Sequence, residues 1–360
     1  MRENVNAIEN NVPKAKKGGR IVGRIFIVLG LVILFLLFFI LGTITVVFRG
    51  PSETAKGLLA TTLMETSAVK FVPRMYFSEE EVELLLKKNS AVAVNEITDT
   101  SLVVIEKKEE SSEEIKPEEN IEIIDISSST YKGKLMIVKD PSKVKVSVSA
   151  ENFGDGKGMK IDEHVEKEGA IAGVNAGGFA DENGMGNGGQ PLGLVIKDGR
   201  VVSGLETYSC VIGLDKDDKL VVGSMKGTEA VERGLRDAVS FGPVYIVNGK
   251  RSEVIGTGGG VNPRTCIGQR ADGAVLLLTI DGRQATSLGA THSDCIDILE
   301  EYGAVNACNM DGGSSSVMMY RDERGLCRCR CDTGNECRLL PGIFPGYRQY
   351  GAAVPLALCI

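Results

Sequence analysis

Hydrophobic and polar residues divide the chain into segments of very different character. Residues 25–48 contain no charged residue and consist mainly of Ile, Leu, Val and Phe. A helix of this length crosses about 30 Å of hydrocarbon, whereas a soluble helix is rarely apolar on every face for so long. This segment is therefore predicted to span a membrane.

Basic residues precede the apolar segment at positions 14, 16, 17, 20 and 24. Such a cluster is usually retained in the cytoplasm. The apolar segment is longer than the core of a secretory signal peptide, and it ends without a small-x-small cleavage site. We expect residues 1–24 to form a basic cytoplasmic tail and residues 25–48 an uncleaved signal anchor. The chain after the anchor is then expected to be extracellular.

Residues 49–120 are predicted to form a stalk. Ser78 and Glu81 make the Ser-x-x-Glu pattern of a capping box ahead of an apolar run, which indicates a short helix beginning at Ser78. Residues 106–120 are almost wholly charged or polar. They cannot bury a core, so a disordered linker is expected there.

Short apolar segments separated by turns continue from residue 121 to the C-terminus. Residues 143–148 alternate polar and apolar side chains, as a half-buried strand does, and residues 274–280 are continuously apolar. Asp198-Gly199, between two such runs, is typical of a hairpin turn. A helix is expected at residues 161–167. Because strands and helices are mixed, residues 121–360 are predicted to form one α/β or α+β domain, built on a mixed β-sheet with flanking helices.

Charge and cysteine content narrow the picture further. The formal net charge of −7 gives no reason to expect nucleic-acid binding. Four of the nine cysteines lie close together, at Cys327, Cys329, Cys331 and Cys337. In an oxidising compartment this density indicates disulfides; a zinc site is the alternative, although zinc sites usually have wider spacing. The cysteines in apolar segments are expected to pack as small buried residues: Cys210, Cys266, Cys295 and Cys308.

Polar residues follow four predicted strands where each meets a glycine or proline break. These residues are Asn175, Arg264, Asp281 and Asp311. Strand ends that converge build ligand sites in α/β proteins. An arginine there suits phosphate or carboxylate, and two carboxylates suit acid–base work at a glycosidic centre. Each residue alone also has a structural interpretation, as a turn residue or a surface ion pair.

One such break follows Asp311, where Gly312 and Gly313 precede Ser314 and Ser315. Adjacent glycines allow close approach to a ligand, and the following amides and hydroxyls suit anionic oxygen atoms. A helix begins shortly before this region, with Thr291 and Asp294 as its expected cap. His292 then lies in the first turn, where a surface position is the favoured interpretation.

Four motifs, taken in order, resemble the phosphodiester glycosidase family. They are Asn-Ala-Gly-Gly-Phe at 175–179, Pro-Arg-Thr-x-Ile-Gly at 263–268, Asp-Gly-Arg at 281–283 and Asn-Ala-x-Asn-x-Asp-Gly-Gly-Ser-Ser at 306–315. The resemblance covers residues 131–320. Two features depart from the family pattern. Gly-Gly-Ser stands where members often have three glycines, and the cysteine-rich segment after Tyr320 looks like an insertion relative to the family.

The resemblance implies cleavage of a sugar-1-phosphodiester, with release of the sugar. Phosphate contact is then expected from Arg264, Thr265 and the turn from Gly312 to Ser315, with Gly177 and Gly178 forming a second glycine turn. Asp281 and Asp311 become candidates for base, nucleophile or sugar-hydroxyl ligand, and Asn175 and Asn309 for holding hydroxyls. Calcium or magnesium bound by Asp281, Asp311 and Asn309 is a further possibility, because hard cations prefer oxygen ligands.

Two other functions fit the same residues. One is a non-catalytic extracellular module that binds a phosphate-bearing polysaccharide, which would need the arginine and glycine turns but no carboxylate pair. The other is a phosphotransferase in envelope-polymer synthesis.

Overall fold

The computed structural model describes residues 17–66, 68–92, 94, 96–105, 120–150, 153–154, 156–181, 186–322, 325–330, 338–339 and 356–360. The predicted linker lies outside these residues except for Asn120, and so do Cys331 and Cys337. The chain divides into two compact units, residues 1–56 and residues 57–360.

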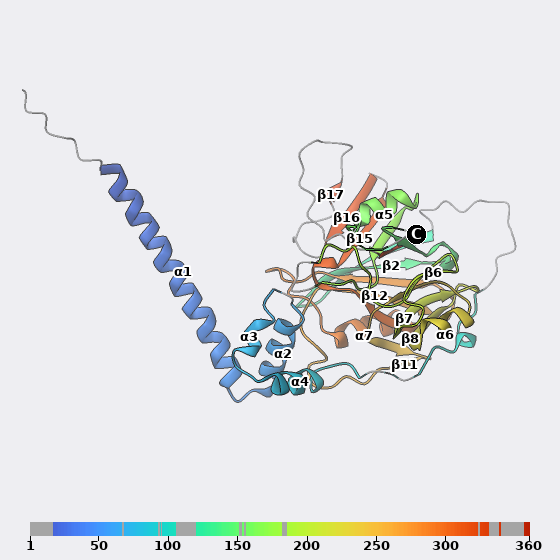
Figure 1. Cartoon of the computed structure of the whole chain (residues 1–360), viewed down its shortest axis with the longest axis horizontal. Helices are drawn as coiled ribbons and strands as arrows, with labels where there is room; N and C mark the ends of the chain where they lie inside the picture. Colours follow the sequence, from blue (N-terminus) through green and yellow to red (C-terminus); the bar gives the residue numbers. More distant parts are fainter. Residues whose placement is uncertain are drawn as a thin grey trace, which may run out of the picture. The chain divides into compact units, whose positions relative to one another are not determined.

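The first unit contains α1 (Lys17–Arg49), a single long helix in Figure 1. Its portion Val22–Arg49 has a mean hydropathy of 3.3 and is long and apolar enough to cross a membrane. The sequence therefore predicted this helix correctly, because length and uniform apolarity are local properties.

The second unit begins within the predicted stalk rather than at residue 121. It takes in the end of α2 (Glu53–Met64), together with α3 (Phe71–Arg74), α4 (Glu79–Lys87) and the 3₁₀ turn η1 (Thr100–Leu102). The capping box of α4 forms as predicted. The Ser78 hydroxyl accepts from the Glu81 N–H at 3.2 Å, and the Glu81 carboxylate accepts from the Ser78 N–H at 2.8 Å.

The largest sheet has seven strands in the order β1-β2-β13-β12-β14-β10-β11. Their bounds are β1 (Ile121–Ser127), β2 (Lys132–Val138), β13 (Val275–Ile280), β12 (Arg264–Arg270), β14 (Ala304–Met310), β10 (Val244–Val247) and β11 (Lys250–Arg251). Neighbouring strands pair antiparallel throughout. Helix α7 (His292–Glu301) packs on one face of this sheet through Cys295, Ile296 and Leu299.

A second sheet has the order β17-β16-β15-β4-β18-β3. It comprises β17 (Arg338–Leu339), β16 (Gly325–Arg330), β15 (Val317–Asp322), β4 (Ala172–Asn175), β18 (Leu356–Cys359) and β3 (Lys145–Val148), after the 3₁₀ turn η3 (Pro141–Lys143). Helix α5 (Ile161–Lys167) packs against it, and its bounds are those that the sequence predicted.

The third sheet has the order β6-β5-β9-β7-β8. It comprises β6 (Arg200–Ser203), β5 (Val195–Lys197), β9 (Leu235–Ser240), β7 (Tyr208–Asp215) and β8 (Leu220–Lys226), with α6 (Gly227–Glu232) after β8. The predicted hairpin joins β5 and β6, and its turn residues Asp198 and Gly199 both have positive φ, 49° and 73°. This is the backbone that a two-residue hairpin turn requires.

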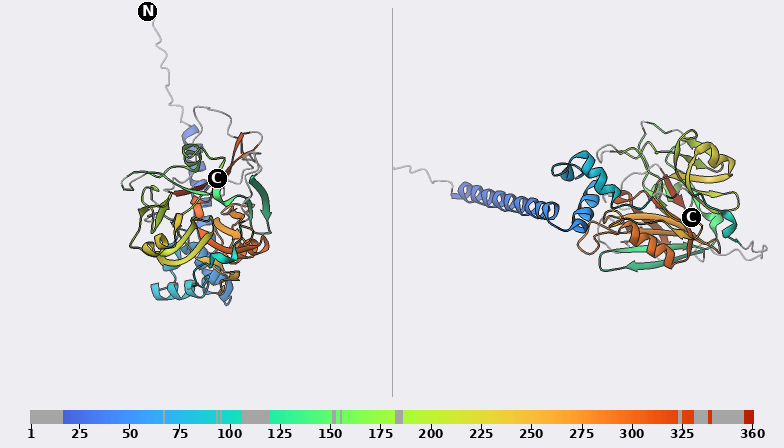
Figure 2. Two further views of the ribbon diagram at one scale, coloured as in Figure 1. Left: turned by 90° about the vertical axis from the view of Figure 1, so that its right-hand side faces the viewer. Right: turned by 90° about the horizontal axis from the view of Figure 1, so that it is seen from below.

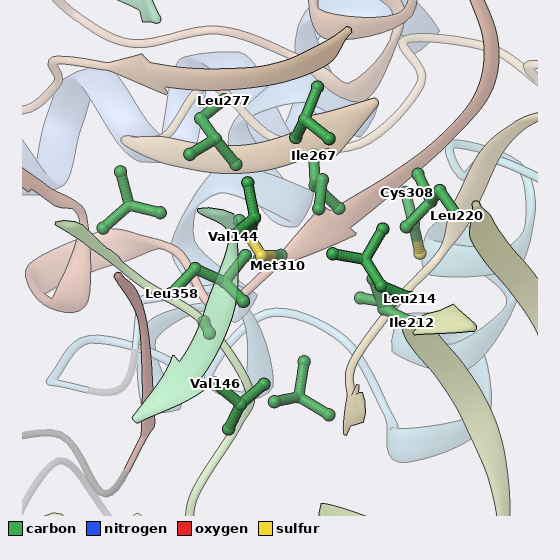
Figure 3. Packing of buried hydrophobic residues seen from close by; sticks show 14 of the residues in the cluster. Val144, Val146, Ile212, Leu214, Leu220, Ile267, Leu277, Cys308, Met310 and Leu358 are labelled. Carbon is green, nitrogen blue, oxygen red and sulfur yellow. The ribbon is translucent and has the colours of Figure 1, made fainter. Parts of the chain in front are cut away.

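Side chains from all three sheets meet in one core. Figure 3 shows Leu277 and Met310 of the first sheet, Leu358 of the second and Leu214 of the third in this cluster. The opposite face of β13 packs beneath α7 through Leu276 and Leu278. Strand β13 is buried on both faces, which explains why its sequence is continuously apolar.

The architecture is α+β, and Figures 1 and 2 show its strands and short helices gathered in the second unit. It differs from the expected mixed sheet in one respect: among the described strands, every pairing is antiparallel. Three of the cysteines expected to pack as small apolar residues are buried, namely Cys266, Cys295 and Cys308, and Cys210 is half-buried.

Candidate functional site

A cavity of about 660 Å³ opens in the second unit where several loops meet. Its walls combine acidic, basic, aromatic and glycine residues. The lining includes Glu65, Thr66, Gly178, Phe179, Asp181, Phe241, Asn262, Pro263, Arg264, Arg283, His292, Asn309, Asp311, Gly312, Gly313, Ser314 and Ser315.

Antiparallel pairing explains why distant motifs meet here. Strand β12 lies between β13 and β14, and both run opposite to it. Arg264, at the start of β12, is therefore paired with Ile280 at the end of β13, and the next residue, Thr265, with Met310 at the end of β14. The residues that follow those two strand ends are Asp281 and Asp311.

The turn after Asp311 lies tightly against the loop before β12. A Cβ at Gly312 would come 2.9 Å from the Pro263 carbonyl oxygen, so only glycine fits without a shift. Gly313 has φ +61° and donates its N–H to the same oxygen at 2.9 Å. The Gly312 N–H donates to the Asp311 carboxylate at 2.9 Å, and the Ser315 N–H to the Gly312 carbonyl at 3.2 Å. These hydrogen bonds fix the conformation of the turn. Ser314 is the residue of the turn that is exposed to solvent.

Asp311 is the half-buried carboxyl of the cavity. Burial raises the pKa of Asp311 to about 7; hydrogen bonds from Ser315 and the Gly312 N–H oppose this increase, and the nearby Asp181 adds to it. Loss of water around a carboxylate disfavours the charged form, which is why burial dominates. Asp311 thus changes charge near neutral pH. Asp181 was not predicted, since it follows the motif at 175–179 without a pattern of its own.

Asn175 positions the Asp311 loop from the second sheet. It is 0% exposed, and its Nδ2 donates to the Asp311 carbonyl oxygen at 2.6 Å. Its Oδ1 accepts from the Thr265 hydroxyl at 2.8 Å and from the Val317 N–H at 3.0 Å. Both Asn175 and Thr265 are thus occupied with internal contacts, and neither lines the cavity within the described part of the chain.

Arg264 is 6% exposed and is held by an acidic residue that the sequence did not reveal. Its Nη2 donates to the Glu65 carboxylate at 2.7 Å and to the Gly260 carbonyl at 2.6 Å, while its Nε donates to the Ala290 carbonyl at 3.1 Å. The same carboxylate accepts from the Gly260 N–H and from Asn262, both at 2.9 Å. The predicted stalk thus supplies one wall of the cavity.

Arg283 is the solvent-exposed cation of the lining. It has φ +58°, and its Nη2 donates to the Thr66 hydroxyl at 3.1 Å and to Asn262 Oδ1 at 3.2 Å. A Cβ at Gly313 would lie 3.4 Å from this Nη2, so the guanidinium reaches the glycine turn. The sequence placed Arg283 in a motif but gave it no role.

The other predicted site residues fall into two groups. Gly178, Asn309 and Ser314 line the cavity, whereas Asp281 and Gly177 are not among the described lining residues. Asp281 follows β13, two residues before the lining residue Arg283, and its N–H donates to the Lys132 carbonyl at 2.7 Å. The described residues contain no group of three His, Cys, Asp or Glu placed to hold a metal ion. The cation site suggested for Asp281, Asp311 and Asn309 stays a prediction; of these residues, Asp311 and Asn309 line the cavity.

His292 is buried in the cavity wall, so the favoured surface position was wrong. It is 9% exposed, and its Nδ1 lies 2.7 Å from the Tyr245 hydroxyl. The capping box of α7 forms as expected, with Thr291 and Asp294 exchanging hydrogen bonds. The capping box fixes where the helix begins. The burial of His292 depends instead on the packing of α7 against β10, which places its ring beside Tyr245.

Comparisons with known proteins identify a matching family and several similar proteins. The family model described as phosphodiester glycosidase matches residues 168–341. A prophage-derived uncharacterised protein of Bacillus subtilis, YomE, is 26% identical over 182 residues, which are 48% of this chain and 27% of that protein. The chain thus spans about a quarter of the length of this curated relative.

Two solved structures are also similar. The catalytic domain of zebrafish N-acetylglucosamine-1-phosphodiester alpha-N-acetylglucosaminidase, auto-inhibited by its pro-peptide, has a TM-score of 0.48 and 21% identity, covering 67% of this chain and 82% of that one. A hypothetical protein from Synechocystis has a TM-score of 0.46 and 15% identity, covering 66% and 61%. Residues 168–341, which contain most of the cavity lining, match the phosphodiester glycosidase family.

Proposed function

We propose that this protein hydrolyses a sugar-1-phosphodiester, with cleavage between the anomeric carbon and the phosphate oxygen. The observation that carries the proposal is the position of Asp311, a carboxyl of raised pKa. It shares one cavity with an exposed arginine and the glycine-serine turn. Hydrolysis of a sugar-1-phosphodiester needs both positively and negatively charged groups in the cavity, because the phosphodiester is negative and the sugar becomes positive during the reaction.

The phosphodiester contacts Arg283 and the Ser314 side of the turn. Arg283 is the exposed guanidinium, whereas Arg264 is committed to Glu65 and backbone carbonyls. Arg264 therefore serves mainly to hold the wall in shape. The sugar lies against the apolar surfaces of Phe179 and Phe241, which line the same cavity.

Asp311 acts as a carboxylate. A phosphodiester is a good leaving group, so a proton donor is less necessary than it is for an alkyl glycoside. A negative charge beside the anomeric carbon stabilises the oxocarbenium-like transition state. Turnover should therefore rise with pH through about 7, as Asp311 ionises.

Cleavage can be tested on the full-length protein in detergent micelles. N-acetylglucosamine 1-(methyl phosphate), in both anomeric forms, and the corresponding glucose compounds are incubated in H₂¹⁸O. Label in the free sugar identifies cleavage at the anomeric carbon; label in the phosphate identifies a phosphodiesterase instead. Transfer of the sugar phosphate to an added alcohol would favour the phosphotransferase. Binding of these compounds without any product would favour the binding module.

Two variants test the residue roles. Asp311→Asn keeps size and hydrogen bonding, and should lower turnover by roughly 100-fold or more, because it removes the charge. Arg283→Ala should raise KM for the phosphodiester about tenfold. Arg233→Ala is its control, since Arg233 pairs with Glu229 on α6 and is not a lining residue. Equal activity of Asp311→Asn and the parent would exclude Asp311 from the chemistry.

We also propose that the second unit lies outside the cytoplasm and acts on an envelope or extracellular glycan. The basis is the apolar helix α1 preceded by basic residues, the arrangement in which the N-terminus usually stays inside.

A further inference from the structure

A chain of buried hydrogen bonds leads from the core to the cavity through Asn309, Tyr245 and His292. The Tyr245 hydroxyl lies 3.0 Å from Asn309 Oδ1 and 2.7 Å from His292 Nδ1. Tyr245 is 0% exposed, and the two rings meet edge to face with centroids 5.6 Å apart. These contacts fix the imidazole without using its second nitrogen.

The direction of each hydrogen bond follows from the amide of Asn309. Its Nδ2 donates to the Gly242 carbonyl at 2.8 Å, so Oδ1 is the atom that faces Tyr245. An amide oxygen only accepts, so the tyrosine hydroxyl must donate its single proton to it. The same hydroxyl can then only accept from the histidine. His292 therefore carries its proton on Nδ1, and Nε2 keeps its lone pair.

Nε2 is the ring nitrogen that Tyr245 does not use. Nδ1 is committed to a fully buried tyrosine, whereas His292 itself lines the cavity. A Cβ at Gly259, which has φ +94°, would lie 2.5 Å from Cδ2 and 3.1 Å from Nε2 of this ring. Gly259 thus packs closely against this side of the ring, where a larger residue would not fit.

The charges around the ring keep it neutral. Burial and the Arg264 guanidinium hold the pKa of His292 well below its usual range. Arg264 lies on β12 and is paired with Glu65; Glu65 and Asp311 line the same cavity as His292, and Asp294 lies in the first turn of α7. An unprotonated Nε2 of fixed tautomer is what a general base requires.

We propose that His292 is the general base that activates the attacking water, and that Tyr245 and Asn309 are its positioning residues. This role rests on the hydrolysis proposed above. The water oxygen forms a bond to the anomeric carbon while the bond from that carbon to the phosphate oxygen breaks, and its electron pair stays on the phosphate. The water proton goes to His292 Nε2, and the imidazolium then releases a proton to solvent. Asp311 supplies the negative charge, and His292 takes the proton.

The tautomer can be measured without a substrate. The chain has two histidines, His164 and His292, so a ¹⁵N-labelled full-length sample in detergent gives two imidazole spectra. The spectrum that disappears in His292→Gln belongs to His292. We expect a protonated Nδ1, a bare Nε2 and a pKa below the usual range of histidine. A proton on Nε2, or a midpoint near 6.5, would overturn the proposal.

The catalytic role is measured on the sugar-1-phosphodiester that the parent cleaves fastest. His292→Ala should lower kcat by about 100-fold or more with little change in KM, the usual loss for a general base. Added imidazoles should restore turnover, and the restored rate should rise with their basicity, which mere filling of the space would not cause. Tyr245→Phe should lower kcat about tenfold, because the Nδ1 proton loses its acceptor.

The outcomes separate this inference from the proposed function. An active parent with His292→Ala within tenfold of it would overturn the base role and leave the hydrolysis standing. Rescue that is independent of imidazole basicity would likewise refute proton transfer at this site. A parent without cleavage of any compound would refute the hydrolysis and the base role together, whichever tautomer the spectra give.

Discussion

The raised pKa of Asp311 leads us to predict how the stability of the protein depends on pH, and this prediction can be tested without a substrate. This carboxyl has an ordinary value of 3.8 and a value of about 7 in the folded protein. A group whose pKa is raised on folding binds protons more tightly in the folded state. It therefore stabilises the fold fully below pH 3.8, and this contribution is lost as pH rises through 7. The full difference corresponds to roughly 4 kcal/mol at about 1.4 kcal/mol for each pKa unit.

Between pH 5 and pH 8, the linkage relation gives a loss of roughly 2.5 kcal/mol in the free energy of unfolding from this group. Asp311→Asn has no charge to bury, so it should lack this component. The assay is urea unfolding of the parent and the variant, full-length in detergent, at both pH values. Subtracting the two proteins removes the contributions of other groups, such as Asp237, whose pKa is also raised.

The expected result is that the parent loses roughly 2–3 kcal/mol more than Asp311→Asn over this pH range, and that the variant is the more stable protein at pH 8. A parallel pH dependence of the two proteins would refute the reasoning, because it would mean that Asp311 is as well solvated in the folded state as in the unfolded chain.

Three further predictions concern packing and topology. Glu65→Ala should lower the free energy of unfolding by roughly 2–3 kcal/mol, because it leaves Arg264 buried without its partner. Glu83→Ala, which breaks an exposed pair on α4, should leave the free energy of unfolding almost unchanged in the same urea titration. Thr291→Ala should lower the free energy of unfolding by about 1 kcal/mol in the same titration, because it removes the cap of α7. Protease added to intact cells should remove the second unit and leave a small fragment with α1; full protection of the chain would contradict the proposed orientation.

The sequence by itself determined the elements whose causes are local. Uniform apolarity identified α1, the capping boxes placed the starts of α4 and α7, and Asp198-Gly199 placed a hairpin. Each depends on residues within a few positions of one another, so periodicity and turn chemistry suffice. The four ordered motifs resemble those of the phosphodiester glycosidase family, and a model of that family matches residues 168–341.

Only the tertiary structure decided which side chains reach the cavity. Arg264 and Glu65 are 199 residues apart in sequence, and Tyr245 and His292 are 47 apart. Antiparallel pairing of β13, β12 and β14 brought three motif ends to one edge, and the side chain of Asn175 joined a second sheet to them. The sequence did not predict that the side chains of Asn175 and Thr265 would form a hydrogen bond with each other. The sequence also did not reveal that the segment after α2 would form part of the cavity wall. Such contacts depend on which buried polar groups find partners once the sheets have packed, and this is a property of the assembled core rather than of any local pattern.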